Sequence, residues 1–434
     1  MPKYNIPRGT RDFPPGEMDM RNNVIRKIEN IFKVYDFRSW DGPAFEHIET
    51  LRRKAGPSVG NEIYTFKDKA DRELGLRFEL TTSLARIIAN NPDLKKPIKA
   101  YSIGKVWRYE NPQQGRYREF LQADVDIFGS ESMACESELL LLAKNVMDDM
   151  GFNDFKVRLN NRKVLYAQIS MADIPEQKSE AALRSLDKLD KLGHECVKDE
   201  FIRNGLTEKH FTNFMDLILK EGDNTYILNK SSSLLAANQI GWQGLEELKQ
   251  ILRILEKTEL KDKIYIAPSL VRGLDYYTGP IFEIEISSGR EVGSVAGGGR
   301  YDKLVGLFGG QSIPAVGISF GIERIIDLIK RDAIKKCQFD ITPPVVQIVY
   351  QNEYLPKVLE IAVFLRSNNI KTSFDLRGGT FKRQFELANR NSARYAIIIG
   401  EEEVSSGYYS LKDLENGKQD KLNLEGISKI LNIR

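Results

Sequence analysis

Two strand-like segments on either side of a basic loop restrict the fold of this chain more than any other feature. Residues 99–110 and 119–129 alternate as half-buried strands do, and residues 111–118, NPQQGRYR, form the loop between them. The apolar face of the second strand is formed by Leu121, Ala123, Val125 and Ile127. Its polar face is formed by Gln122, Asp124 and Asp126. We therefore expect a hairpin in a sheet whose apolar face is buried.

The polar face of this hairpin has two interpretations. Period two places Arg108 and Glu110 on one face, next to a loop that carries Arg116 and Arg118. These side chains are either the solvated surface of a sheet or the polar floor and basic rim of a binding site. The residues alone favour neither.

The segments before the hairpin predict helices and short strands. We expect a helix over residues 17–35, followed by a strand into residues 41–43, Asp-Gly-Pro, which form either core or a self-complementary dimer surface. Residues 63–80 are interpreted as a hairpin in which Glu79 points away from the apolar face. The Thr-Thr-Ser at residues 81–83 is expected to cap the helix that follows.

The character of the chain changes near residue 174. A helix over residues 133–150 and a strand over residues 155–159 precede this point. From residue 174 to 260, leucines keep helical spacing, charges fill the gaps and glycines are few. We predict an all-helical insertion, whose lysine-rich faces either are solvated or contact a polyanion. A β-rich core resumes at Lys263.

Residues 269–286, SLVRGLDYYTGPIFEIEI, concentrate arginine, glycine and tyrosine before a strand. Gly273 and Gly279 permit turns, so Arg272 is held on a bend beside Tyr276 and Tyr277. One interpretation is a tyrosine-rich hairpin with a solvated arginine. The other is a guanidinium that binds phosphate or carboxylate through two parallel hydrogen bonds.

Two further features are suited to an anionic or flat ligand. The glycines at 297–299 allow backbone to approach a ligand closely, although their spacing is neither a dinucleotide fingerprint nor a P-loop. Arg324 falls in the first turn of a predicted helix, where the macrodipole disfavours a cation. It fits best if it shares an anion with the helix terminus, and a plain surface arginine is the alternative.

The last part of the chain predicts a separate binding domain. Pro343 and Pro344 mark a linker, after which strands and helices alternate. This pattern indicates a compact α/β domain with a mostly parallel sheet. It carries no catalytic group of residues, so we expect it to bind rather than catalyse.

Composition excludes several classes of site. Lys and Arg total 64 and Asp and Glu total 61, so a nucleic-acid site has to be a local patch. The three cysteines and three histidines are scattered, which argues against a disulfide scaffold, a zinc finger, a histidine metal site and a Ser-His-Asp triad. No apolar run is long enough to span a membrane and no signal peptide is recognised, so we expect a cytoplasmic protein.

Taken together, these residues resemble the class II histidyl-tRNA synthetases over essentially the whole chain. Residues 31–46 resemble class II motif 1, a dimer element, residues 106–120 resemble motif 2, and residues 314–325 resemble motif 3. The stretch LVRGLDYYTGPIFE is similar to the signature specific to the histidine enzymes, and GGGRYDKLV accompanies it. The C-terminal part resembles the anticodon-binding module shared with the threonyl, prolyl and glycyl enzymes.

This resemblance implies an α+β catalytic domain, with an antiparallel sheet flanked by helices, in two parts. The expected segments are the first catalytic part at 1–173, the helical insertion at 174–260, the second catalytic part at 261–342 and the α/β anticodon-binding domain at 343–434.

The resemblance also implies roles for individual residues. Arg272 and Arg108 would be catalytic, reaching the reacting carboxylate and the α-phosphate of ATP, with Glu110, Arg116 and Arg324 completing the ATP site. Histidine would be bound by Glu79, Leu80, Thr81, Arg108, Gln122, Asp126, Arg272, Tyr276, Tyr277 and Tyr301. Of these, Glu79, Thr81 and Gln122 would hold the α-amino group, and Asp126, Tyr277 and Tyr301 the imidazole. Many family members carry Glu where this chain has Asp126, which moves the charge by about one methylene.

The implied reaction is the ATP-dependent activation of L-histidine to histidyl-adenylate, followed by transfer to the 3′ end of tRNA(His). Mg²⁺ would enter with ATP, no protein cluster would hold a metal, and the enzyme would be a homodimer. Arg116 and Arg118 would contact the tRNA acceptor stem. Because the nucleophile is an ionised carboxylate, the reaction needs no general base, which suits a chain without a catalytic His or Cys pair.

Two alternatives belong to other functional classes. A histidyl-synthetase-like paralogue serves as the regulatory subunit of a histidine-biosynthetic phosphoribosyltransferase, but such chains typically lack the C-terminal domain and parts of the signature. A different class II synthetase with the same anticodon module would lack RGLDYYTG. The presence of Arg108, Arg272, Arg324 and residues 344–434 weighs against the regulatory subunit.

Overall fold

The computed structural model describes residues 4–54, 60, 62–113, 115–218, 222–272, 276–332 and 346–432. The chain forms two compact units, Met1–Phe339 and Asp340–Arg434. The predicted linker prolines, Pro343 and Pro344, lie outside the described residues.

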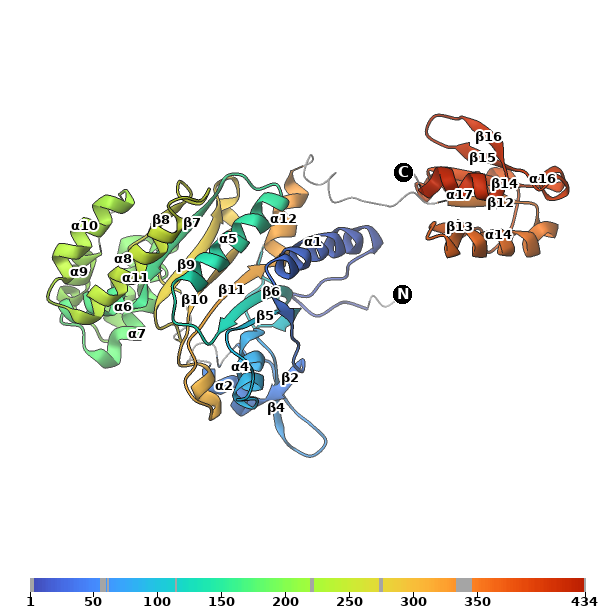
Figure 1. Ribbon diagram of the computed structural model, residues 1–434. Helices are drawn as coiled ribbons and strands as arrows, with labels where there is room; N and C mark the ends of the chain where they lie inside the picture. The colour runs from blue at the N-terminus through green and yellow to red at the C-terminus, as the bar shows by residue number, and fades with distance from the viewer. Residues whose placement is uncertain are drawn as a thin grey trace. The chain divides into compact units, whose positions relative to one another are not determined.

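The first unit is built on an eight-stranded sheet with the order β1-β5-β6-β11-β10-β9-β7-β8 (Figure 1). Its strands are β1 (Arg38–Ser39), β5 (Ile98–Trp107), β6 (Glu119–Phe128), β7 (Phe155–Asn161), β8 (Ile264–Ile266), β9 (Pro280–Ile286), β10 (Ala296–Arg300) and β11 (Ala315–Gly321). The six central strands are antiparallel, as expected, and only the outer pairs β1–β5 and β7–β8 are parallel.

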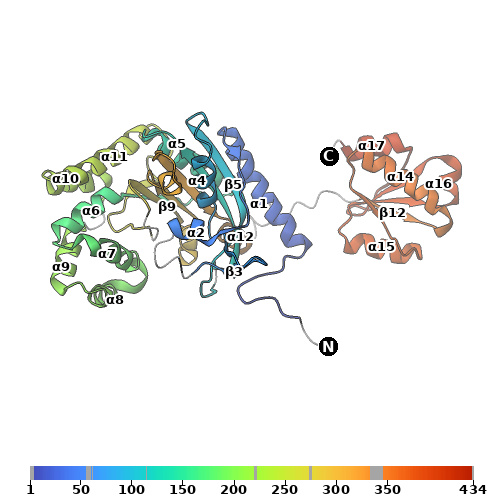
Figure 2. The same cartoon turned by 90° about the horizontal axis from the view of Figure 1, so that it is seen from below.

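One face of this sheet is apolar and covered by helices, as the alternation in residues 119–129 predicts. The covering helices are α1 (Pro15–Val34), α5 (Ala134–Asp149), α11 (Gln239–Leu255) and α12 (Ile322–Arg331). Ala123, Val125 and Ile127 of β6 join their apolar side chains in one large core. Figures 1 and 2 show α1, α5 and α12 lying along this face.

The segment 174–260 is helical, as predicted, but its helices divide between two cores. They are η1 (Glu176–Lys178), α7 (Ser179–Leu186), α8 (Leu189–Arg203), α9 (Glu208–Leu217), α10 (Asn224–Leu235) and α11, preceded by α6 (Arg162–Met171). α10 and α11 join the core on the apolar face of the sheet. α7, α8 and α9 form a lobe whose core continues into the opposite face, beside Tyr277 and Tyr301. The boundaries of a separate insertion domain stay a prediction.

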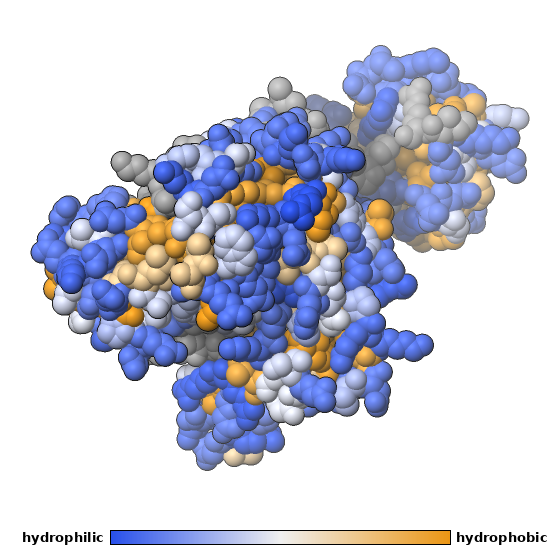
Figure 3. All heavy atoms as spheres, turned by 60° about the vertical axis from the view of Figure 1, so that its left-hand side comes forward, coloured by the Kyte–Doolittle hydropathy of each residue, from blue (hydrophilic) through white to orange (hydrophobic). Residues whose placement is uncertain are grey.

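The helical part of the first unit presents a largely hydrophilic surface on the face drawn in Figure 3. In Figure 3, which turns the left-hand side of Figure 1 towards the viewer, hydrophilic residues dominate and hydrophobic groups interrupt them. This agrees with the expectation that charges fill the gaps between the buried leucines of these helices.

A three-stranded antiparallel sheet with the order β2-β4-β3 carries the residues before α4 (Thr81–Ala89). Its strands are β2 (Phe45–His47), β3 (Thr65–Lys67) and β4 (Glu73–Leu76), and α2 (Ile48–Lys54) packs on it. The alternation predicted a strand as far as residue 80, but β4 ends at Leu76. There the backbone changes partners, because the amide of Arg77 donates to Ala44 and its carbonyl accepts from Trp107 of β5. Arg77 thus links the two sheets.

The second unit has a five-stranded sheet with the order β13-β12-β14-β15-β16. Its elements are β12 (Val346–Tyr350), η4 (Asn352–Tyr354), α14 (Leu355–Ser367), β13 (Thr372–Phe374), α15 (Phe381–Arg390), β14 (Tyr395–Ile399), α16 (Glu401–Ser406), β15 (Tyr409–Asp413), β16 (Gln419–Leu422) and α17 (Leu424–Asn432). Two of its four strand pairs, β13–β12 and β12–β14, are parallel and the other two are antiparallel, so the expectation of a mostly parallel sheet is wrong. A hairpin predicted from the sequence at residues 408–421 is confirmed as β15–β16, whose short turn joins antiparallel strands.

Candidate active site

The floor of the candidate site is the polar face of the eight-stranded sheet. Asp126 of β6 lies opposite Gly317 of β11, which lies opposite Gly299 of β10. One row along, Asp124 lies opposite Ser319, and Gly297 lies between Ser319 and Glu283 of β9. The small residues of β10 and β11 therefore separate two acidic positions. Gln122, Asp124 and Asp126 are at most 8% exposed, so the interpretation as a solvated sheet surface is wrong.

The glycines of β10 make room for protein atoms. A Cβ atom on Gly297 would collide with the guanidinium of Arg272, and one on Gly298 would collide with the backbone carbonyl of Gly317. In the same way, a Cβ atom on Gly317 would collide with the carboxylate of Asp126. The glycine run was expected to admit a ligand, but its first effect is to let Arg272 lie flat on the sheet.

Three tyrosines and one carboxylate gather at one end of this floor. The ring centroids of Tyr276 and Tyr277 are 4.6 Å apart, and Tyr276 and Tyr301 are 5.6 Å apart. The hydroxyl of Tyr301 donates a hydrogen bond to Oδ1 of Asp126. Burial, and then the negative charge of Asp126, raise the pKa of Tyr301 well above its usual value. The phenol therefore stays protonated as a donor, and the result is a buried cluster of aromatic and acidic side chains, the candidate pocket for an amino acid.

Glu79 and Gln122 lie near this pocket with polar groups of their own. The carboxylate of Glu79 accepts the amide of Thr82 at 2.7 Å and that of Thr81 at 3.2 Å. Glu79 therefore caps α4, and the expected Thr-Thr-Ser cap is wrong, since the cap residue Leu80 makes no side-chain bond. Nε2 of Gln122 donates to Oγ of Ser319 at 2.7 Å, while its buried Oε1 accepts no hydrogen bond from the described residues.

Arg272 lies between the tyrosines and Glu283. Its Nη1 is 2.5 Å from Oε1 of Glu283, and its side chain is 20% exposed. Burial works against the charge, but Glu283 and then the tyrosines outweigh it, so the pKa of Arg272 is raised. The interpretation as a plain hairpin with a solvated arginine is therefore wrong. Gly273, which was expected to form the adjoining turn, lies outside the described residues.

Arg324 lies at the start of α12 with three other arginines around it. Its Nη1 donates to the carbonyl of Ser294 at 2.5 Å. Burial lowers the pKa of Arg324, and the positive charges of Arg116, Arg272 and Arg108 lower it further. Glu283 opposes this lowering, so Arg324 carries its charge among other arginines with partial compensation, beside the N-terminus of a helix. An arrangement of this kind is stabilised by a bound polyanion.

The loop after β5 supplies two of these arginines. Nε of Arg108 donates to the carbonyl of Phe78 at 2.9 Å, and its Nη1 lies 3.9 Å from Oε1 of Glu110. Arg116 pairs with the other oxygen of Glu110 at 3.3 Å. Arg118 lies apart from this pair: it donates to the carbonyl of Glu110 and covers the ring of Tyr109.

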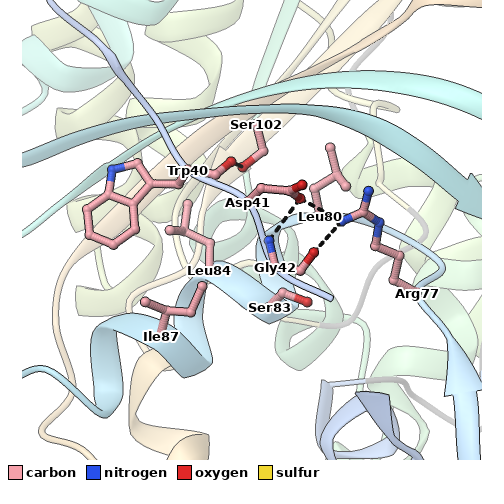
Figure 4. Close-up of a pocket in the computed structure, with 9 residues that line it drawn as sticks. All are labelled: Trp40, Asp41, Gly42, Arg77, Leu80, Ser83, Leu84, Ile87 and Ser102. Atoms are coloured by element: carbon pink, nitrogen blue, oxygen red, sulfur yellow. Dashed lines mark hydrogen bonds and ion pairs between the residues drawn. The ribbon is translucent and has the colours of Figure 1, made fainter. Parts of the chain in front are cut away.

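A separate small hollow lies beside the turn at residues 41–43 (Figure 4). Nη1 of Arg77 donates to Asp41 at 2.8 Å and to the carbonyl of Gly42 at 2.9 Å, and Ser102 donates to the carbonyl of Trp40 at 2.7 Å. Of the predicted histidine-binding residues, only Leu80 lines this hollow. Its contacts tie the turn to β5 and α4.

Sequence reasoning missed three charged residues around the site: Glu283, Glu323 and Arg11. Glu283 was detectable, because the alternation of Phe282 and Ile284 places it on the opposite, polar face. Glu323 is buried and pairs with both Arg11 and Arg21. No local pattern indicates that pairing. Among the described residues, no group of three or more acidic, His or Cys side chains is placed to hold a metal ion, and no helix is both long and apolar enough to cross a membrane.

Comparisons with known proteins agree with this architecture. A family model for histidyl-tRNA synthetase matches residues 9–325, and a model for an anticodon binding domain matches residues 344–433. A histidine–tRNA ligase from Aeropyrum pernix is 37% identical, over 95% of this chain and 94% of the relative. One from Cytophaga hutchinsonii is 34% identical, over 98% and 99%. The crystal structure of the histidyl-tRNA synthetase from Nostoc has a TM-score of 0.82 at 27% identity, with all of both chains covered.

A synthetase model over the first unit and an anticodon-binding model over the second define the class. The chain is an aminoacyl-tRNA synthetase, a ligase with an α+β catalytic unit and a C-terminal anticodon-binding unit. Within that class, the chain belongs to the histidyl-tRNA synthetase family.

Proposed function

We propose that the two ends of the site carry out the two recognition tasks of a histidine–tRNA ligase. The chain activates L-histidine with ATP to histidyl-adenylate, releases pyrophosphate, and transfers histidine to the 3′ end of tRNA(His). The observation that carries the proposal is the tyrosine and carboxylate cluster on the polar face of the sheet, where Gly297 makes room for Arg272 and Glu283 pairs with it.

The pocket end recognises the side chain of the amino acid. Asp126 accepts from one imidazole nitrogen, and Tyr277 and Tyr301 complete a polar ring with Tyr276 as its wall. Glu79, Thr81 and Gln122 hold the α-ammonium group, for which the buried Oε1 of Gln122 is a suitable acceptor. A pocket of buried polar groups rejects an apolar analogue, which would leave those groups unpaired.

The arginine end carries out adenylation. A carboxylate oxygen of histidine attacks the α-phosphorus of ATP, the bond to the bridging oxygen breaks, and pyrophosphate leaves with that electron pair. No proton has to move. Arg108 and Arg272 stabilise the charge that grows on the α-phosphate, and Arg116 and Arg324 hold the outer phosphates. Arg272 would be held for this task by Glu283.

Mg²⁺ enters as part of the ATP substrate and supplies further charge neutralisation. Magnesium in such sites is commonly held by substrate phosphates and one or two carboxylates. Glu110 fits that role, since its two carboxylate oxygens face Arg108 and Arg116.

The tRNA engages both units. Arg116 and Arg118 in the loop after β5 contact the acceptor end, and the C-terminal unit binds the anticodon, in keeping with the family model that matches it. Phosphate contacts of this kind weaken as salt rises. The proposal extends to assembly and location: residues 31–46 form the interface of a homodimer, and the protein is cytoplasmic. Residues 174–260 form the insertion domain.

A histidine-dependent ATP–pyrophosphate exchange assay tests the proposal. Exchange with histidine and with no other amino acid is the expected result. Exchange with another amino acid would point to a different class II synthetase. The absence of exchange would favour the regulatory-subunit alternative, against which the match of residues 344–433 to an anticodon-binding model already stands.

A further inference from the structure

The segment before α1, residues 4–14, which we call the N-terminal arm, lies against the loop after β5. The amide of Arg118 donates to the carbonyl of Gly9 at 2.8 Å. Gly9 has a φ of +85°, and a Cβ atom there would lie 2.8 Å from Cγ of Arg118 and 2.9 Å from Cγ of Pro112. The arm is therefore fitted to the loop at a position that only glycine fills without strain.

Arg11 extends this contact with its side chain. Its guanidinium carbon lies 3.6 Å from the centre of the Tyr117 ring, an aromatic residue between Arg116 and Arg118. On its other side, Arg11 pairs with Glu323 and lies 4.0 Å from Asp327, both on α12. One arginine thus holds a loop residue and a helix residue at the same time.

The two partners of Arg11 are themselves joined to the site. The hydroxyl of Tyr117 donates to Asp327 at 3.2 Å, so the loop and α12 also meet directly. Glu323 precedes Arg324, and Oε1 of Glu323 accepts the amide of Leu121, which follows the loop in β6, at 3.2 Å. These contacts fix the spacing between the loop that carries Arg116 and the helix turn that carries Arg324.

We propose that Arg11 is a positioning residue that clamps the loop at 109–118 onto α12, so that Arg116 and Arg324 reach the same ATP. The inference rests on the proposed function of these two arginines. Its physical basis is that the two carry like charges and repel each other. Nε of Arg324 meets the loop at the Gly115 carbonyl, but at a long 3.4 Å, so other residues have to supply a stronger tether. Arg11 supplies it by stacking on Tyr117 and by pairing with Glu323.

The test compares Arg11→Ala and Tyr117→Leu with the full-length chain in histidine-dependent ATP–pyrophosphate exchange. Each variant is expected to raise the KM for ATP on the order of tenfold, with the KM for histidine unchanged. In the double variant the two effects on the KM for ATP are expected not to add, because each substitution removes the same contact between Arg11 and Tyr117. Arg11→Lys keeps the charge but loses the planar stack, and its effect should be intermediate.

Lys330→Ala is the matched control. Lys330 pairs with Glu17 of α1 at 3.0 Å from the far end of α12, a surface ion pair that involves no loop residue. Its KM for ATP is expected to stay at that of the parent chain. Equal rises in both KM values for Arg11→Ala, or an ATP KM no higher than that of the control, would overturn the proposal.

Hydrogen exchange at the Arg118 amide separates this inference from the proposed function. That amide bonds to Gly9, and its protection is expected to fall in Arg11→Ala and not in Lys330→Ala. If the parent chain shows no exchange with histidine, the proposed function fails, yet loss of protection still supports the clamp. If protection is unchanged, the clamp fails even in an active enzyme.

Discussion

Nη1 of Arg272 lies 2.5 Å from Oε1 of Glu283, above a position of β10 where Gly297 leaves the sheet without a side chain. The arginine proposed to act on the α-phosphate is therefore oriented before any substrate arrives. Preorientation of this kind lowers the reorganisation needed in the transition state. It also assigns Glu283 a role that no contact with substrate would reveal.

Glu283→Gln is expected to slow adenylate formation while leaving histidine affinity unchanged. The amide keeps the shape of the side chain but removes the charge that orients Arg272, and loss of a charge-assisted bond is worth about 1.5–3 kcal/mol, or roughly ten- to a hundredfold. Single-turnover kinetics and the Kd for histidine measure the two quantities separately. Glu285→Gln is the control, because Glu285 lies two residues along the same strand and pairs with Arg158 at 3.0 Å. Equal losses in both variants would show a general effect on the sheet.

Arg272→Ala is expected to reduce the rate of adenylate formation far more than it weakens histidine binding. Its guanidinium would act chiefly on charge that develops during the reaction, and removal of one such group typically costs about 10²–10³ in rate. Pre-steady-state pyrophosphate release gives the rate, and equilibrium dialysis gives the affinity. If rate and affinity fall by the same factor, Arg272 binds the ground state and the assigned role is wrong.

Tyr301→Phe is expected to raise the KM for histidine by roughly tenfold or more. The substitution removes the hydroxyl that donates a hydrogen bond to Oδ1 of Asp126, and hydrogen bonds to charged groups are worth about 1.5–3 kcal/mol. Tyr101→Phe removes another tyrosine–carboxylate bond, from the partly buried hydroxyl of Tyr101 to Glu29 at 2.8 Å, on the opposite face of the sheet. That control should keep the parent KM for histidine. A Tyr301→Phe enzyme with unaltered KM would remove Tyr301 from the imidazole pocket.

Alkaline pH is expected to destabilise the fold through Tyr166 of α6, whose hydroxyl donates to Glu180 of α7. Burial raises the pKa of Tyr166 to about 12, although Arg162 opposes the rise; Glu180 adds to it. The unfolded chain loses this proton near pH 10 and the folded chain only near pH 12, so the stabilisation is complete below pH 10 and disappears as pH rises between these values. Tyr166→Phe should reduce the slope of unfolding free energy against pH in that window by the contribution of one proton. An unchanged slope would contradict the shift.

The two faces of β6 could be predicted because alternation is a local property of a strand. The same reasoning places Glu283 on the face of β9 opposite Phe282. Its pairing with Arg272 could be recognised only in the structure. The end of β4 could not be predicted, since it depends on Arg77 leaving one sheet to bond with another. A pattern of side chains carries no information about where a backbone changes partners.

The site residues divide in the same way. Arg272 and Arg324 could be selected from their surroundings in the sequence, a bend with glycines and a first helical turn. The helix cap made by Glu79 could not, because it requires the carboxylate to fold back onto two amides that follow it. The glycines at 297–299 were correctly singled out, but the atoms that need the space belong to Arg272 and to Gly317, far away along the chain.

The pairing of Arg11 with Glu323 spans 312 positions of sequence. During synthesis the arm leaves the ribosome before the rest of the first unit, and its partner on α12 is among the last residues of that unit to be made. While the first unit is being made, the loop at 109–118 therefore lacks the Arg11–Glu323 pair that we propose holds it in place. Completion of α12 is thus the event that would finish the proposed ATP site, because it supplies both Arg324 and the partner of Arg11.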